Sequence, residues 1–356
     1  MGEGRGTKAQ WFARGLKRIL EAHGHRFIER PEPNVRLVIN VVDIDRPKPY
    51  RRKAQATFVV SVVEARGEPP DILSAAYPIL VRSLANVLIY LVPQGGGVKA
   101  YFVTLELGRY PIVYDGGDEH AYFEQVYQRL APLATSHLVI RNIFVPDLPP
   151  ELWHGDEITR QLQWAGRQLD ALNLLPAAFP IQEILSPRDY RHVQRLYGLG
   201  GLSYGNLSAR RDGTSFWMSA SGVNKGNLRE IGRDLLLVKG YDARQEAIVL
   251  SVPPNVEPRR VSVDAIEHWM IYTEHREVQA IIHVHAWMDG VPSTEMNYPC
   301  GTVELASAVA ELVRRAPDPS RAVIGLRNHG LTITGRSIPD IFERIEGKII
   351  PQVPML

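Results

Sequence analysis

Two histidines separated by one residue, His283 and His285, lie in the apolar segment 278–286. The aliphatic residues around them predict a buried β-strand. Because side chains alternate between the two faces of a strand, both imidazoles project to the same side. Neutral imidazole is a good ligand for zinc and similar transition metals. The pair therefore indicates a metal site, and the alternative is two core histidines that bond to the backbone.

A stable zinc site needs a third protein ligand, and a catalytic site keeps one position open. His329 is the candidate, because segments 322–326 and 331–334 read as strands joined by the tight turn 327–330. We expect Gly330 to supply the unusual backbone of this turn. A histidine at a strand end can point into a site, and together with the first pair it favours a metal over a simple turn histidine.

Bulk composition sets the limits for the whole chain. The 356 residues are 45% hydrophobic, which is enough for two domains with real cores. A net charge of +2 gives no global argument for nucleic acid or membrane binding. The single cysteine, Cys300, excludes an intrachain disulfide and fits a reducing compartment, so we expect a cytoplasmic protein.

Neither a signal peptide nor a membrane span is predicted. The N-terminus has no apolar signal core. The most apolar stretch, 72–92, contains Arg82 and reads as part of a buried helix over 71–91.

Residues 1–150 predict an α+β accessory domain of unknown role. Helical spacing occurs at 11–22, 71–91 and 119–133, and β-branched segments occur at 35–44, 54–63, 99–114 and 137–144. We expect one sheet covered by helices on one face. The basic connection 46–53 reads as a solvated hairpin loop.

A linker with a helix is expected at 151–185, and a second domain at 186–356. Pro146–Pro150 ends the first region, and Ser186 followed by Pro187 has the pattern of a helix start.

Two small-residue loops in this second domain could approach an anion. Gly205-Asn206 and Ser221-Gly222 should lie at one end of a hairpin, where backbone N–H groups and two polar side chains face outward, with Lys225 nearby. Asp264 falls in the first turn of a helix that leads into the His283 strand. Its carboxylate could be a fourth metal ligand or a general base. The alternative is a partner of the helix dipole.

The motifs occur in a fixed order between about Ser186 and Ile345. They are Gly205-Asn206-Leu207-Ser208, Ser219-Ala220-Ser221-Gly222, Asp264 with His268 and Tyr272, His283-Val284-His285, Glu304-Leu305-Ala306 and Arg327-Asn328-His329-Gly330-Leu331. This series resembles the class II aldolase/adducin family, which includes fuculose-phosphate aldolase and ribulose-phosphate 4-epimerase. The resemblance implies a three-layer α/β/α domain with a mostly antiparallel sheet. It also implies a homo-oligomer, a tetramer being favoured, with active sites between subunits.

The resemblance also assigns residues by position. His283, His285 and His329 match the ligands of zinc or another divalent metal. The substrate-phosphate loops match Gly205, Asn206, Ser221, Gly222 and Ser262.

Asp264 takes the acidic position of the family. This position is a Glu acid/base in the aldolases and a metal-binding Asp in the epimerases. Family members can carry a catalytic tyrosine in a C-terminal tail, whereas no tyrosine follows Tyr298 here. We therefore expect the proton donor to be missing or to come from elsewhere.

The implied function is an aldolase, a carbon–carbon lyase that cleaves a small phosphorylated sugar or related hydroxy-carbonyl compound. A divalent metal chelated by neighbouring oxygens of the substrate lowers the cost of an enediolate, from which the bond can break. A sugar-phosphate epimerase or dehydratase with the same metal site is the first alternative. A non-catalytic adducin-like assembly module is the second, and the retention of all three histidines argues against it.

Overall fold

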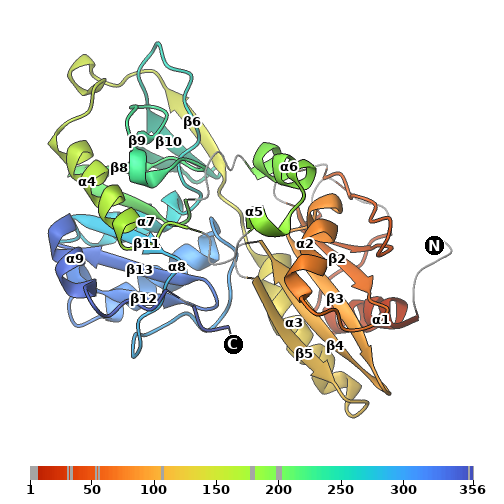
Figure 1. The fold of residues 1–356 in the computed structure, drawn as a ribbon. Coiled ribbons are helices and arrows are strands. Elements are labelled where there is room, and N and C mark those ends of the chain that lie inside the picture. The colour runs from red at the N-terminus through yellow and green to blue at the C-terminus, as the bar shows by residue number, and fades with distance from the viewer. Residues whose placement is uncertain are drawn as a thin grey trace. The chain divides into compact units, whose positions relative to one another are not determined.

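The computed structural model describes residues 7–29, 32, 35–52, 54, 57–105, 108–176, 181–197, 203–351 and 353–355. The chain divides into two compact units, each with its own sheet (Figure 1). The first unit lies within residues 1–135, 179–193 and 355–356, and the second within 136–178 and 194–354.

The first unit is built on a five-stranded sheet with strands in the order β1-β2-β3-β4-β5. Its strands are β1 (Leu37–Val41), β2 (Phe58–Glu64), β3 (Val87–Gln94), β4 (Gly97–Thr104) and β5 (Gly108–Tyr114). Its helices are α1 (Thr7–Ala22), α2 (Ile72–Arg82), α3 (Glu119–Thr135) and α5 (Ile181–Ile184). Strands β1, β2 and β3 run parallel, whereas β3, β4 and β5 run antiparallel. The connection after β1 is therefore a crossover and not the expected hairpin loop, since only antiparallel strands can be joined by a hairpin.

The stretch expected as one helix over 71–91 contains two elements. Helix α2 begins as predicted, because the Asp71 side chain accepts hydrogen bonds from the backbone N–H groups of Leu73 and Ser74, both at 3.1 Å. The helix ends at Arg82, and Leu84 has a positive φ of 56° that no α-helix contains. The following residues form β3. The prediction was wrong here because an apolar run alone does not distinguish a buried helix from a buried strand.

Helices cover both faces of the first sheet, whereas the sequence predicted cover on one face. Consecutive residues from Phe58 to Val63 in β2 are all buried, so side chains on both faces lie under other elements. Figure 1 shows α2 in front of this sheet and α3 behind it. Helix α1 packs on α3 through the ring contacts of Trp11 and Phe12 with Phe123. Among the described residues, no helix is long and apolar enough to cross a membrane.

The second unit contains an eight-stranded sheet of order β12-β13-β11-β7-β8-β9-β10-β6. The strands are β6 (Arg141–Val145), β7 (Asn206–Asp212), β8 (Ser215–Ser219), β9 (Leu235–Asp242), β10 (Ala247–Ser251), β11 (Ala280–Val284), β12 (Val323–Leu326) and β13 (Gly330–Gly335). Only the β10–β6 pair among these is parallel. The mostly antiparallel sheet expected from the resemblance is thus confirmed.

Helices lie on both sides of this sheet and complete a three-layer arrangement. They are α4 (Glu157–Ala171), α7 (Ala265–Glu274), α8 (Val303–Arg315) and α9 (Ile338–Ile345), with the short η1 (Pro150–Leu152), η2 (Lys225–Asn227) and η3 (Pro319–Arg321) in connections. Helix α6 (Pro187–Tyr197) precedes β7 and begins in the first unit. Helices α4 and α9 meet through the rings of Trp164 and Phe342, whose centroids lie 5.2 Å apart. Helices α7 and α8 are joined by an ion pair between Arg314 and Glu274 at 2.5 Å.

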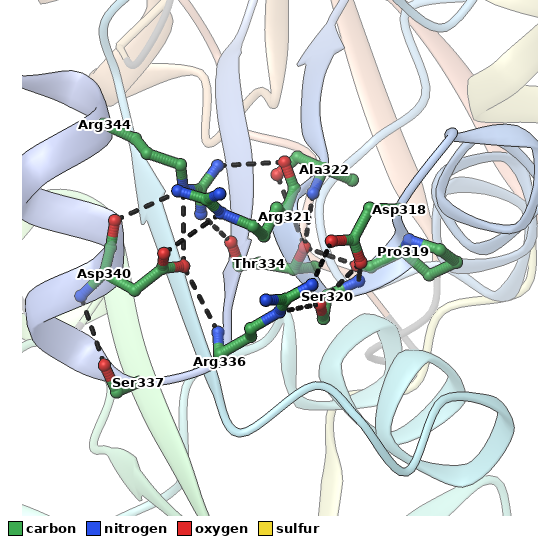
Figure 2. Close-up of polar contacts among 10 residues, drawn as sticks. All are labelled: Asp318, Pro319, Ser320, Arg321, Ala322, Thr334, Arg336, Ser337, Asp340 and Arg344. Atoms are coloured by element: carbon green, nitrogen blue, oxygen red, sulfur yellow. Dashed lines mark hydrogen bonds and ion pairs between the residues drawn. The ribbon is translucent and has the colours of Figure 1, made fainter.

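A polar network attaches α9 to the edge of the sheet (Figure 2). The guanidinium of Arg344 donates to the backbone oxygens of Arg321, at 2.9 Å, and Thr334. It also pairs with the Asp340 carboxylate at 3.3 Å, and Arg321 pairs with the same carboxylate at 3.1 Å. Helix α9 covers β13 and β11, so this network supports the strands that carry the candidate site.

We expect Arg344→Met to lower the free energy of unfolding by about 1–3 kcal/mol, because buried carbonyl groups and a carboxylate lose a charged donor. Arg336→Met is the matched control. Arg336 pairs with Asp318 at 2.7 Å, but its side chain is 63% exposed, against 15% for Arg344. The control should lose less than about 1 kcal/mol. Urea unfolding followed by tryptophan fluorescence measures both variants, and equal losses would contradict the prediction.

Candidate metal centre

The structure brings the three predicted histidines together. His283 lies in β11, His285 follows the end of that strand, and His329 lies in the turn between β12 and β13. The antiparallel pairing of β11 with β13 places this turn beside the end of β11. The ligating atoms of the three imidazoles lie within 4.8 Å of one another, and the Nε2 atoms of His285 and His329 are 3.1 Å apart.

Burial gives these imidazoles the properties of metal ligands. His283 Nδ1 lies 3.0 Å from the backbone oxygen of Leu331 and donates its proton there, which leaves the lone pair on Nε2. That Nε2 atom is buried and has no hydrogen-bond partner among the residues described. Burial lowers the pKa of all three histidines below the usual value, so the neutral form is favoured.

The turn that carries His329 differs in one detail from the prediction. Asn328, and not Gly330, has the left-handed backbone, with φ of 58°. Asn is one of the few residues that tolerate this region. Gly330 is required for another reason, because a Cβ atom there would lie 2.2 Å from the carbonyl oxygen of Val284. This close approach of the turn to β11 sets His329 beside the other two histidines.

Three polar side chains form a row across the neighbouring strands. His283 is directly opposite Asn206 of β7 and Thr332 of β13. The first turn of α7 lies over this row: Asp264 Oδ2 accepts a hydrogen bond from Asn206 Nδ2 at 2.8 Å, and Glu267 Oε1 accepts one from Thr332 Oγ1 at 2.6 Å. The two carboxyl groups therefore flank His283.

Asp264 does not act as a helix cap. Its side chain makes no hydrogen bond to the N-terminal N–H groups of α7, although it occupies the cap position. Its Oδ1 atom is buried and has no partner within the described part of the chain. A buried carboxylate oxygen without a structural partner is unusual in a folded protein, so the geometry disfavours the simple helix-terminus reading of Asp264.

The two predicted anion loops also meet. Asn206 begins β7 and Ser221 follows β8, its neighbour in the sheet. The Ser221 N–H donates to the Arg260 carbonyl at 2.9 Å, and the Ser262 N–H donates to the Ser219 carbonyl at 3.2 Å. These contacts place Ser221 beside the segment that carries Ser262. The assignment of phosphate binding to Gly205, Asn206, Ser221, Gly222 and Ser262 stays a prediction. Gly205 lies directly against β11, since a Cβ atom there would be 2.3 Å from the carbonyl oxygen of His283.

Sequence reasoning gave no role to several polar residues near this site. Ser208 Oγ contacts His268 Nδ1 at 2.7 Å and the Tyr272 hydroxyl at 2.9 Å. Burial lowers the pKa of His268 to about 3, so it stays neutral. Cys300 Sγ lies 3.4 Å from Nε2 of His329. The spacing of His268 and Tyr272, four residues apart on one helix, was the available signal for a shared inward face.

Glu267 was also missed, because a glutamate on a helix is ordinarily exposed. Its side chain is buried, and its Oε2 atom has no partner among the described residues. Burial and the nearby charge of Asp264 raise the pKa of Glu267 to about 8. The carboxyl group is therefore mostly protonated at neutral pH in the metal-free protein.

Comparison with known proteins follows this geometry. A sequence model described as the class II aldolase and adducin N-terminal domain matches residues 190–294, which include Asp264, His283 and His285. Residues 190–294 thus form a class II aldolase/adducin domain. Over 176 residues it is 23% identical to methylthioribulose-1-phosphate dehydratase from Klebsiella pneumoniae, an alignment that covers 40% of this chain and 79% of that protein.

Two solved structures are each similar to about half of the chain. An L-fuculose 1-phosphate aldolase has 18% sequence identity and a TM-score of 0.37, with 54% of this chain and 81% of that chain covered. The L-fuculose-1-phosphate aldolase from Thermus thermophilus has 18% identity and a TM-score of 0.32, with 52% and 86% covered.

Glu267 should make the stability of the metal-free protein depend on pH. Its folded pKa of about 8 lies above the ordinary value of 4.5, so the folded state holds a proton that the unfolded chain releases. The stabilising contribution is complete below pH 4.5 and is lost as the pH rises to about 8. Glu267→Gln should flatten this decline.

Urea unfolding at several pH values, with a chelator present, measures the effect. Glu343→Gln, on the exposed surface of α9, is the control and should keep the parent slope. The prediction fails if Glu267→Gln and the parent lose stability equally across this range.

Proposed function

We propose that the second unit is a divalent-metal-dependent lyase acting on a small phosphorylated sugar or related hydroxy-carbonyl compound. The observation that carries the proposal is the histidine cluster, whose three sets of ligating atoms lie within 4.8 Å of one another. The match to the class II aldolase/adducin model and to a dehydratase supports it, since aldolases and dehydratases are lyases.

The three imidazoles fit a divalent ion, with zinc as the candidate. They are neutral, and neutral imidazole nitrogen is the donor that zinc and related metals prefer. The buried Nε2 of His283 has no partner among the described residues, and an unsatisfied buried polar atom is destabilising. A bound divalent cation supplies positive charge that stabilises negative charge on a substrate oxygen.

The side chains around the cluster supply orientation and proton transfer. The Leu331 carbonyl holds the His283 ring through Nδ1 and keeps Nε2 directed at the cluster. The Asn206 amide holds one oxygen of Asp264, which leaves Oδ1 to accept a proton from the substrate or to act as a further metal ligand. In this proposal the loops at Gly205 and Ser221 bind the phosphate group through N–H and hydroxyl donors.

Cleavage and dehydration are the two lyase reactions to be separated. Aldol cleavage removes a hydroxyl proton and breaks a carbon–carbon bond, whereas dehydration removes a carbon-bound proton and expels a hydroxyl group. Aldolase activity is the first candidate. The match to methylthioribulose-1-phosphate dehydratase favours dehydration as the second. Incubation with a panel of ketose and aldose phosphates, followed by mass spectrometry, distinguishes two carbonyl fragments from loss of water.

Three further features belong to the proposal. The chain is proposed to form a homo-oligomer, with a tetramer favoured, to act in the cytoplasm, and to carry an accessory domain at its N-terminus. Light scattering coupled to size exclusion tests the assembly. An epimerase with the same metal site would interconvert sugar phosphates without releasing fragments, and an adducin-like assembly module would show no turnover in the same panel.

The metal proposal predicts about one divalent ion per chain, bound at about 2.0–2.1 Å by imidazole nitrogen. His283→Ala should lose most of this metal, because the site keeps only two of its three imidazoles. His154→Ala, an exposed histidine of the same unit, should retain it. Elemental analysis by mass spectrometry after reloading with zinc measures the content. Parent protein that cannot be loaded with any divalent ion would remove the basis of the proposal.

Asp264→Asn separates the two roles of this carboxylate. An amide is neither a base nor a good metal ligand, so both roles predict a loss of activity of about 10²-fold or more. Only the ligand role also predicts weaker metal binding, measured by competition with a chromogenic chelator. Asp212→Asn is the control, because Asp212 lies at the other end of β7 from Asn206, the partner of Asp264. Full activity and full metal affinity in Asp264→Asn would leave this residue without a functional role.

A further inference from the structure

Lys225 is a buried cation without a salt-bridge partner. Its side chain belongs to η2, directly after the Ser221-Gly222 loop, and the residue is 3% exposed. Its Nζ atom donates to the backbone oxygens of Ser203 at 2.5 Å and Val223 at 3.4 Å. Among the residues described, no carboxylate lies within ion-pair distance of this ammonium group. Removing an ammonium group from water is strongly unfavourable unless an anion compensates for it.

The alternative is that Lys225 only ties two loops together. Its backbone N–H donates to Ser203 Oγ at 3.0 Å, so the residue does join the loop before β7 to the loop after β8. A neutral amide side chain could donate to the same carbonyl groups without the desolvation of a charge. An ammonium group has three N–H donors, and the two carbonyl contacts account for two of them. The retained charge and the third donor therefore point to an anionic ligand.

The position of Lys225 identifies the kind of anion. It bonds to Ser203, two residues before Gly205, and Gly205 packs against the carbonyl oxygen of His283, so Lys225 belongs to the loops beside the histidine cluster. Burial lowers the pKa of Lys225 to about 8, which leaves the group mostly protonated at neutral pH. The two carbonyl groups that its ammonium group contacts, those of Ser203 and Val223, lie next to the two loops predicted to bind phosphate.

We propose that Lys225 is the residue that selects a doubly charged phosphate monoester over an uncharged hydroxyl end of the substrate. This assignment rests on the proposed function. The amide of Asn206, the hydroxyl of Ser221 and the N–H of Gly222 supply directional hydrogen bonds, and Lys225 supplies the point charge that a phosphate dianion requires.

Binding of inorganic phosphate to the metal-loaded protein, measured by calorimetry, tests the assignment. Lys225→Gln keeps an N–H donor for the Ser203 carbonyl but removes the charge, and it should weaken phosphate binding by about 10–100-fold. The metal content should remain that of the parent. Lys239→Gln is the matched control, because it removes a lysine of the same unit whose ammonium group pairs with Asp147. That control should bind phosphate as the parent does.

Kinetics with an active substrate give a second readout. Lys225→Gln should reduce the preference for the phosphorylated over the unphosphorylated substrate by a similar factor, mainly through KM. If the variant binds phosphate as tightly as the parent, Lys225 is only a link between loops and the assignment is overturned.

If the variants do not fold, the assignment of Lys225 can be tested on the parent protein. Phosphate should raise the pKa of Lys225, followed by NMR of ¹³C-labelled lysine ε-carbons, and an unchanged pKa would overturn the assignment. Failure of the proposed function has a different signature, because the parent would then hold no divalent ion at the histidines whatever its affinity for phosphate.

Discussion

Strand β11 is paired on both edges, with β7 on one side and β13 on the other, and this pairing positions the polar residues of the second unit. It aligns Asn206, His283 and Thr332 in a row across three strands. A shift of one residue in either register would turn the aligned side chain to the opposite face, because the side-chain period of a strand is two. The contacts of Asp264 and Glu267 with this row exist only in the observed register.

Burial then determines the charge of the titratable groups in and around this row. It favours neutral histidine at positions 268, 283, 285 and 329, and a protonated carboxyl at Glu267. A fully apolar row would be easier to bury, since each unsatisfied polar atom is destabilising. The unit can accommodate this loss because a large apolar core, which includes Trp217, Phe216 and Leu236, surrounds the same strands. Such clusters of perturbed groups occur most often at functional sites.

Local patterns in the sequence were sufficient for the features that depend on neighbours in the chain. The alternation around His283 predicted two imidazoles on one face, and the predicted helix start at residue 71 agrees with the start of α2. Features that depend on distant partners were not predictable in this way. Leu84 interrupts an apolar run that reads as one helix, and β6 pairs with β10, which lies more than a hundred residues later. The domain limits at 150 and 186 remain predictions.

The same distinction applies to the site. His283, His285 and His329 are recognisable because a metal requires particular residue types. Glu267 is not recognisable in the sequence, because it is unusual only through its burial, and burial follows from tertiary packing. Lys225 could be placed near the anion loops from the sequence, but its burial could not be predicted.

The charges of the proposed site balance when it holds no ligand and when it holds both, but not when it holds only one. With neutral histidines and a protonated Glu267, the buried charges of Lys225 and Asp264 cancel each other. A divalent cation at the histidines adds two positive charges, and a phosphate monoester adds about two negative charges. Either ligand alone would leave a large net charge in a buried volume, where charge is poorly solvated. Each ligand should therefore favour the binding of the other by an equal amount, since coupling between two sites is reciprocal.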